Sequence, residues 1–390
     1  MSLARNLGEI NRTRLKKYDE AIKAYRIALT KQPEDLQAHT IIAELYELND
    51  EVDKAIAEHY RMIELNPRSI ESYQQIRRLF MESGKYDEAW CVCQVLSYLG
   101  HANPDERAFF EKYRSKTLTQ ARKALDNEQW GLVYHPELSL MLAHMCQRMY
   151  QYTVPLMAVQ HKDLKLHKKK DLVDAAEQTP FNSVFNYVTQ ATRLSRVEVF
   201  RLPDGGSGMT TGNFNPPAVL VGGDVLAGRS LQELAFIVSK QLFMMGQHYY
   251  LATIDTTYER RKSRLSTIIY TVTKLVNPSA EVPFKDDGLL EAYRQIPAAD
   301  LQEIAKIIAK MSENPAQHLN LSKWLEMVEH TSNRLGLLLS NDLGAAVRCL
   351  KNETSQFSKA PVQDRVRELV LYALSENYFK LRKALGLAIG

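Results

Sequence analysis

The sequence has 390 residues, of which 45% are hydrophobic and 25% are charged. This composition is ordinary for a folded globular protein and excludes wholesale disorder, and the length allows two or three domains. The formal net charge of +4 is too small over this length to favour nucleic acid as a partner.

Several features of the sequence predict a cytoplasmic protein. It contains no uninterrupted apolar run of about 18 residues, so we expect no transmembrane helix. The N-terminal segment lacks the apolar core of a secretory signal. The cysteines are spaced like neither a zinc site nor a disulfide framework, so we expect buried free thiols at Cys91, Cys93, Cys146 and Cys349.

The N-terminal third contains three segments that recur at one period. Ala21, Ala55 and Ala89 follow one another at intervals of 34 residues, and Pro33 and Pro67 are separated by the same interval. The small alanine lies where two helices of a hairpin approach closely, and the proline closes each unit after its second helix. This pattern resembles the tetratricopeptide repeat and predicts an α-solenoid.

The array is expected to span residues 1–104 in three units. Their first helices are predicted over Leu3–Leu15, Leu36–Leu48 and Ile70–Ser83. The first of these is unusually polar. Two explanations stay open: terminal repeats are polar on the outside, or the chain begins partway through a longer solenoid.

The concave face of such an array is lined by the first helices and binds a peptide or a helix of a protein partner. The side chains expected there are polar and slightly acidic, and they lack the paired lysines and asparagines with which chaperone-binding members hold a C-terminal carboxylate. Alternatively, this face is solvated or packs against the chain's own C-terminal part. The expected groove positions are Gln37, Thr40, Glu44, Glu71, Gln74 and Arg78.

The region after the repeats is predicted to be mainly helical with little β structure. Asn103 and Glu106 carry the signals of a helix start, so we expect a capping or linker helix over residues 105–128. The remaining domain, residues 129–390, is expected to hold a small sheet of two or three strands that includes Val197–Leu202 and Ala218–Val221. Further helices are predicted over Pro136–Tyr150, Pro180–Leu194, Thr256–Val276, Leu289–Gln295, Ala298–Ser312, Leu343–Lys351 and Val362–Leu385.

The stretch Ser230–Gly246 is the most informative part of this domain. Its apolar residues recur at helical spacing, and Ser230 with Glu233 forms a capping-box pattern. The order of strand, turn and capped apolar helix resembles the gluzincin zinc metallopeptidases of the CAAX prenyl protease type. In that family the helix continues into the zinc-binding motif HExxH, where this chain has Lys-Gln-Leu-Phe-Met from Lys240 to Met244.

The three residues that replace the motif cannot perform its chemistry. Lys240 is an ammonium without a lone pair for zinc. Met244 offers a soft thioether that suits Cu(I) better than zinc. Gln241 cannot act as a general base, because its amide takes up no proton.

A second helix, predicted over Leu321–Ser340, carries the other half of the resemblance. The family takes its third zinc ligand from a helix with the pattern Glu-x-x-Ala-Asp-Arg-x-Gly. In this chain Glu329, Arg334 and Gly336 match that pattern, whereas Ser332 and Asn333 depart from it.

These observations favour a non-catalytic protein-interaction scaffold without metal or cofactor. A repeat array would recruit a protein partner, and a peptidase-like domain would have lost its zinc ligands. Its vestigial site positions are Lys240, Gln241, Met244, Glu329 and Asn333. Two alternatives stay open. The helices could belong to another α-rich domain, or the chain could be an active metal-dependent peptidase or other hydrolase with an unrecognised ligand set around Glu329, drawn from His330, Glu233 and His248.

Overall fold

The computed structural model describes residues 2–313, 320–353 and 357–389. The chain forms two compact units. Unit 1 comprises Met1–Arg114, Ala373–Phe379 and Ala388–Gly390, and unit 2 comprises Ser115–Tyr372 and Lys380–Leu387. None of the described helices combines the length and the apolar character that crossing a membrane requires.

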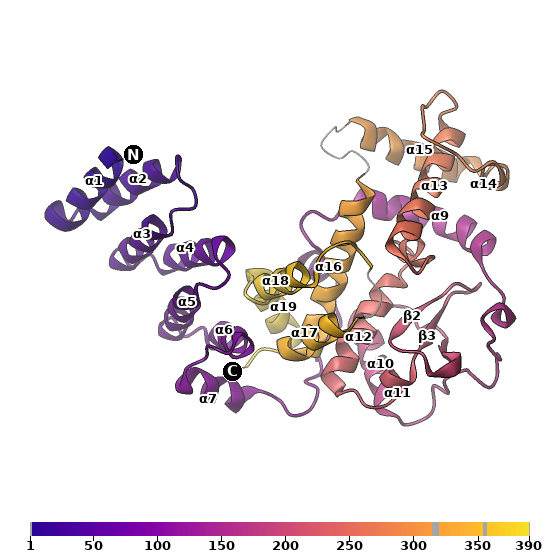
Figure 1. Ribbon diagram of the computed structural model, residues 1–390, viewed down its shortest axis with the longest axis horizontal. Helices are drawn as coiled ribbons and strands as arrows, with labels where there is room; N and C mark the ends of the chain where they lie inside the picture. Colours follow the sequence, from indigo (N-terminus) through magenta and orange to yellow (C-terminus); the bar gives the residue numbers. More distant parts are fainter. Residues whose placement is uncertain (1, 314–319, 354–356, 390) are drawn as a thin grey trace. The chain divides into compact units, whose positions relative to one another are not determined.

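Unit 1 consists of stacked helix pairs, consistent with the predicted repeats (Figure 1). The alanines that define the period, Ala21, Ala55 and Ala89, are fully buried, because a larger side chain would hold the paired helices apart. The bounds are α1 (Ser2–Ile10) with a π-helical turn η1 (Asn11–Leu15), α2 (Tyr18–Leu29), α3 (Leu36–Leu48), α4 (Val52–Leu65), α5 (Ile70–Glu82), α6 (Tyr86–Leu99) and α7 (Pro104–Tyr113).

The helix predicted to continue to residue 128 is shorter than expected. It starts at the predicted capping box, in which Asn103 and Glu106 bond each other's backbone N–H, but α7 ends at Tyr113. The residues that follow bond to the backbone of unit 2 instead. For example, the N–H of Leu125 donates a hydrogen bond to the carbonyl oxygen of Ala191 at 2.7 Å. The prediction of a capping or linker helix over 105–128 is therefore wrong beyond Tyr113.

The last predicted helix, Val362–Leu385, is divided into two helices in the structure. α18 (Val362–Ala373) and α19 (Glu376–Leu385) are separated at Ser375, whose hydroxyl accepts a hydrogen bond from the N–H of Tyr378 and so caps the second helix. The segment Ala373–Phe379 belongs to unit 1, where Phe379 packs edge-on against Phe80. The repeat unit therefore includes a C-terminal segment that the predicted domain division assigned to residues 129–390.

Unit 2 is built around two long helices. α12 (Leu231–Met244) packs along α16 (Leu321–Ser340), and α10 (Pro180–Thr192) and α17 (Leu343–Asn352) pack against α12 as well. Every residue of α16 from Met327 to Ser340 is buried, and the prediction for this helix is confirmed at both ends. The other helices are α8 (Asn127–Val133), α9 (Leu140–Met157), α10 (Pro180–Thr192), α11 (Gly223–Leu226), α13 (Tyr258–Val276), α14 (Asp287–Tyr293), α15 (Ala298–Glu313) and α17 (Leu343–Asn352).

A three-stranded mixed sheet in unit 2 confirms the predicted small sheet. The order is β1-β3-β2, with β1 (Val199–Arg201) parallel and β2 (Met209–Gly212) antiparallel to β3 (Ala218–Val221). β3 is central because its four apolar residues are buried on both faces. β2 was not predicted, because the short sequence Met-Thr-Thr-Gly lacks the apolar alternation of a strand. It occupies one edge of the sheet.

Candidate functional site

The position of α12 is fixed at its start and along its length. Ser230 and Glu233 form the predicted capping box, which sets the first turn of the helix. Further along, Gly336 of α16 lies against Phe236, where a Cβ atom would stand 2.7 Å from the Phe236 ring and 3.1 Å from its carbonyl oxygen. A glycine at this crossing lets the two helices approach closely, which brings Lys240 of α12 next to Glu329 of α16.

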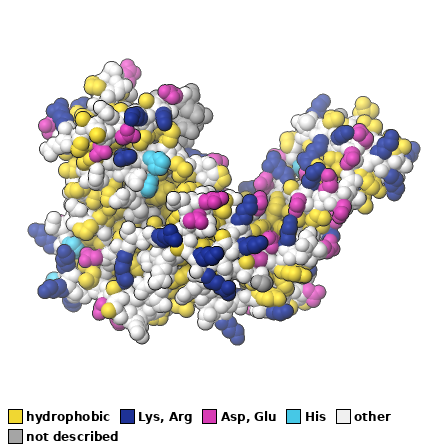
Figure 2. All heavy atoms as spheres, turned by 180° about the vertical axis from the view of Figure 1, so that it is seen from behind, with side chains coloured by type: hydrophobic (Ala, Val, Ile, Leu, Met, Phe, Trp, Pro, Cys, Tyr) yellow, Lys and Arg dark blue, Asp and Glu magenta, His cyan; other side chains and the backbone are white. Residues whose placement is uncertain are grey.

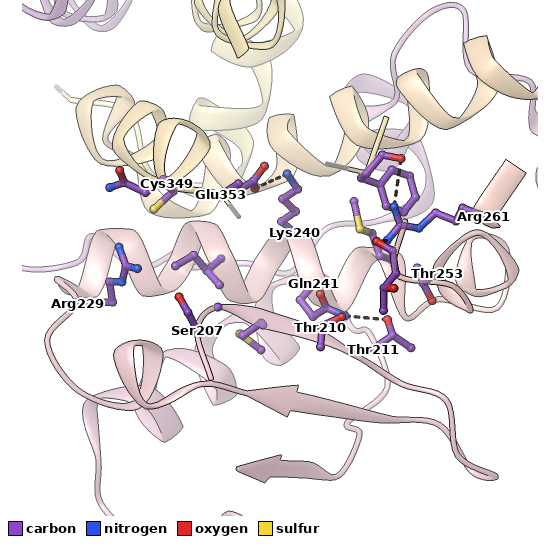
Figure 3. Close-up of a pocket in the computed structure, with 17 residues that line it drawn as sticks. Ser207, Thr210, Thr211, Arg229, Lys240, Gln241, Thr253, Arg261, Cys349 and Glu353 are labelled. Carbon is purple, nitrogen blue, oxygen red and sulfur yellow. Dashed lines mark hydrogen bonds and ion pairs between the residues drawn. The ribbon is translucent and has the colours of Figure 1, made fainter. Parts of the chain in front are cut away.

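Four charged side chains meet at this crossing, and we call them the Lys240 cluster: Lys240, Glu329, Glu353 and Arg365. The ammonium Nζ of Lys240 lies 2.5 Å from Glu353 Oε1, as drawn in Figure 3, and 3.5 Å from Glu329 Oε1. The guanidinium of Arg365 lies 3.0 Å from Glu329 and 2.7 Å from Glu353. Two cations and two carboxylates therefore neutralise one another inside unit 2.

Glu329 is held as a carboxylate at the centre of this cluster. Only 1% of the residue is exposed, and Ser358 Oγ donates a hydrogen bond to Glu329 Oε2 at 2.6 Å. Burial alone would raise the pKa of Glu329, but the charges of Lys240 and Arg365 and the Ser358 hydrogen bond outweigh it, so its pKa is lowered. Both carboxylate oxygens have protein partners, and a lysine ammonium lies where a bound cation would have to approach.

The remaining positions that the resemblance selects separate into two groups. Gln241 donates to the hydroxyl of Thr211 on β2 at 3.1 Å, and Met244 lines the same cavity as Lys240 and Gln241. Asn333 is fully buried, and neither atom of its amide group has a hydrogen-bond partner within the described residues. Four of the five predicted positions thus lie around one region, while Asn333 takes no part in it.

Sequence reasoning missed the partners that complete the cluster. Glu353 follows α17, Ser358 lies beyond it, and Arg365 is in the first turns of α18. No motif marks these residues. An arginine that is buried within an amphipathic helix carries no sequence signal beyond its place on the apolar face.

The cavity beside the cluster has a volume of about 310 Å³ and lies between β2 and α12 (Figure 3). Arg261 lies in its wall, where the guanidinium stacks on Phe357 at 4.6 Å and burial lowers its pKa to about 10. Hydroxyl groups make up much of the remaining lining: Ser207, Thr210, Thr211, Thr253 and Thr256.

The residues considered for an alternative ligand set have other partners. Glu233 caps α12 and pairs with Arg348 at 2.9 Å. His330 lies 3.5 Å from Glu326, and His248 lies beside His144. Across residues 2–313, 320–353 and 357–389, no three His, Cys, Asp or Glu side chains are grouped so that they could hold a metal ion.

A second candidate site is the groove of unit 1, of about 720 Å³, which we call the repeat groove. Thr40, Glu44, Glu71 and Arg78 line it, as the repeat pattern predicts. Gln37 and Gln74 are not among its lining residues. The groove is lined by Leu36, Thr40 and Glu44, which follow one another at four-residue spacing along α3, and by Glu71, Gln75 and Arg78 along α5. The other lining residues are Glu47, Leu48, His59, Met62, Ser69 and Ser72.

Charge in the repeat groove is unevenly distributed. Arg78 is held by Glu47 at 2.6 Å and by Glu82 at 2.9 Å. Glu44 is more than half exposed and lies 3.8 Å from the guanidinium of Arg12, and Glu71 is exposed as well. The exposed part of the groove wall is therefore acidic.

His59 makes the stability of unit 1 sensitive to acid. Burial lowers its pKa to about 4, and its Nδ1 has no hydrogen-bond partner within the described chain. Because the folded pKa lies below the ordinary value of 6.5, the unfolded chain binds the proton first as the pH falls. We expect unit 1 to lose about 2 kcal/mol between pH 7 and pH 5 through this group, measured by urea denaturation and hydrogen exchange of α4.

Two comparisons isolate this effect. Between pH 7 and pH 5, the variant His59→Leu should lose about 2 kcal/mol less stability than the wild type. The variant His101→Gln, which changes an exposed histidine, should show the pH dependence of the wild type. His39 acts in the opposite direction, because its hydrogen bond to Glu58 raises its pKa and its contribution is lost as the pH rises. Equal pH dependence in wild type and His59→Leu would contradict the assignment.

The two units together define a mainly helical, repeat-like protein with a small three-stranded mixed sheet. No protein family model matches the chain, and no curated protein sequence matches it. One solved structure that it resembles is Naa15/Naa10 bound to HypK-THB, with 13% sequence identity and a TM-score of 0.21. The match covers 89% of this chain and 57% of that chain, so this chain spans less than two thirds of that protein. A likeness at this level carries no argument about function.

Proposed function

We propose that this chain is a protein-interaction scaffold that holds a segment of a protein partner in the repeat groove. The observation that carries the proposal is the groove itself, which is open, about 720 Å³ in volume and lined by side chains of α3, α4 and α5. Four of its lining residues are ones that the period of the repeats selects. Stacked helix pairs commonly present such a surface to a peptide or helix.

The chemistry of the groove indicates the kind of partner. Glu44 and Glu71 provide negative charge that is open to solvent, and Leu48 is largely exposed beside them. A segment that combines lysine or arginine with apolar side chains matches this wall. Such complementarity favours association and selects against acidic segments.

Unit 2 is proposed to be a peptidase-like domain that is kept for its shape rather than for catalysis. The contact between Lys240 and Glu329 supports this, because an ammonium lies 3.5 Å from the carboxylate that the resemblance identifies as a metal ligand. Arg365 supplies a second positive charge to the same carboxylate. The side chains of Lys240 and Arg365 would thus neutralise Glu329, as a metal ion does in a peptidase. Unlike a metal ion, they provide no Lewis acid for catalysis.

Charge reversal in the groove tests the interaction role. The double variant Glu44→Arg/Glu71→Arg is expected to reduce capture of the partner by at least about tenfold, because it repels a basic segment. The measurement is quantitative affinity purification from the source cells. Both glutamates are exposed, so the variant should fold normally.

A charge-matched control keeps the interpretation clear. Glu20→Arg/Glu64→Arg changes two exposed glutamates of α2 and α4, neither of which lines the groove. This control should retain the wild-type partners. If the groove variant retains every partner as well as the control does, the repeat groove is not the recruiting surface.

A further inference from the structure

An apolar face is exposed on the first helix of unit 1, and we call it the α1 face: Leu3, Leu7, Ile10 and Leu15. These side chains are 81%, 53%, 43% and 53% exposed, respectively. A row of exposed apolar side chains at helical spacing marks an interaction surface.

The corresponding face is buried in the other two helix pairs. Leu3, Leu7 and Ile10 are spaced by four and then three residues, and the same spacing recurs on α3 and α5. There the side chains are at most 2% exposed: Ala38, Ile42 and Leu45 on α3, and Ser72, Ile76 and Leu79 on α5.

The π-helical turn explains how α1 fits this register. Equivalent positions of this face are 34 residues apart between α3 and α5, as from Ala38 to Ser72. Between α1 and α3 they are 35 residues apart, as from Leu3 to Ala38. The additional residue coincides with the turn Asn11–Leu15, because a π turn takes up one residue more than an α turn. On another side of α1, Gly8 lies against the ring of Tyr25 in α2. The hairpin α1–α2 is thus closed along Gly8, and the α1 face is left uncovered.

The array itself shows what covers such a face. Ala38, Ile42 and Leu45 of α3 form one buried cluster with α2. α4 packs on α5 in the corresponding place. The α2 residues of the cluster occupy a single stripe along an amphipathic helix: Ala21, Ile22, Tyr25 and Leu29.

Charge at the end of α1 further defines the occupant. The covering helices α2 and α4 both have acidic residues in their first turn, and Asp53 of α4 pairs with Lys85 at 2.9 Å. Lys17 precedes Lys85 by 68 residues, twice the period of 34. Lys17, Lys16 and Arg14 are exposed beside the α1 face, and Figure 2 shows hydrophobic and basic side chains together at this end of unit 1.

We propose that the α1 face binds an amphipathic helix of a partner protein, which runs antiparallel to α1 and carries acidic residues in its first turn. The apolar stripe of that helix covers Leu3, Leu7 and Ile10 as α2 covers α3. Its acidic turn lies beside Lys17, as Asp53 lies beside Lys85. A second copy of this chain fits less well, because pairing two α1 faces supplies no carboxylate for the basic cluster. This surface is separate from the repeat groove.

The test uses the full chain and a helix-constrained, fluorescently labelled peptide with the sequence of α2, Tyr18–Leu29. We expect saturable binding by fluorescence anisotropy. Leu7→Glu should weaken it at least about tenfold, and Lys17→Glu at least about threefold. Exposed Ile27→Glu, which lies outside the α1 face, should leave it unchanged. A peptide with lysine in place of both first-turn acids should bind more weakly than the original.

Three results would overturn the proposal. The peptide could fail to bind at about 1 mM, or bind Leu7→Glu as well as the wild type. Light scattering could instead reveal a dimer that Leu7→Glu dissociates, which would assign the face to a second copy. Peptide binding by Glu44→Arg/Glu71→Arg should equal that of the wild type, so failure of the repeat groove as a binding site is distinguished from failure of the α1 face.

Discussion

Replacing Arg365 by methionine is expected to destabilise unit 2 by about 3–5 kcal/mol. The side chain is buried and bonds both Glu329 and Glu353, so its loss removes one of the two cations of the Lys240 cluster and leaves both carboxylates. A buried charge without sufficient compensation costs more than the lost contacts alone, because desolvation is no longer offset. Urea denaturation, with hydrogen exchange of α12 and α16 as the readout for unit 2, measures the change.

Exposed Arg367→Met on the same helix provides the control and should change stability by less than about 0.5 kcal/mol. Adding Glu329→Gln to Arg365→Met should recover part of the loss, because the uncompensated charge is then removed. The loss should also diminish in acid. The lowered pKa of Glu329 means that the stability it contributes is present above its ordinary pKa of 4.5 and is lost as the pH falls through the folded value. A loss below about 1 kcal/mol for Arg365→Met would contradict the assigned role.

The sequence predicted the two central helices of unit 2 because local and periodic signals agreed. α12 begins at the capping box of Ser230 and Glu233, and the apolar period continues to its end. α16 has both a capping asparagine and a long apolar stripe. The close packing of the two helices followed only from the resemblance, since periodicity identifies the buried face of a helix but not its neighbour.

The incorrect predictions share a physical cause, which is competition from contacts distant in sequence. α7 ends at Tyr113, and the chain continues without regular secondary structure and is bonded to other parts of unit 2. The helix break at Ser375 depends on one side-chain cap. The residues on both sides of it have high helical propensity, so the sequence pattern predicts one continuous helix. Similarly, Arg365 lies on α18 and contacts Glu329 and Glu353. No sequence motif connects α18 with the Lys240 cluster.

The repeat groove was easier to predict because each unit repeats the geometry of the one before it. A period of 34 residues placed Glu44 and Arg78 in corresponding positions, and both line the groove. The period gives equivalent positions but not which of them reach the groove: Glu71 and Thr40 line it, whereas their equivalents Gln37 and Gln74 do not. The apolar α1 face was missed for a related reason, because its register is shifted by the π-helical turn.

The triple variant Lys240→His/Gln241→Glu/Met244→His is expected to bind one equivalent of zinc, whereas the wild type binds none. Positions 240 and 244 are one helical turn apart, so both imidazoles can reach one ion. Glu329 already lies within 3.5 Å of the Lys240 ammonium, which the substitution removes. We expect a dissociation constant below about 1 μM by competition with a chelating dye. The affinity should fall about 10- to 100-fold with Lys240→His/Gln241→Glu/Met244→Leu, which lacks one ligand.

The same measurement separates the scaffold from the metal-dependent hydrolase that the sequence left open. A hydrolase with another ligand set around Glu329 would hold a full equivalent of zinc in the wild-type protein and lose it on Glu329→Ala. The proposed scaffold holds zinc only when Lys240 is replaced, because the ammonium and the metal ion compete for one carboxylate. Arg365 also bonds Glu329, so adding Arg365→Lys to the triple variant should tighten zinc binding by loosening that contact. If the triple variant folds as the wild type does yet binds no zinc, the crossing of α12 and α16 is not a former metal site, and the likeness to a peptidase fails with it.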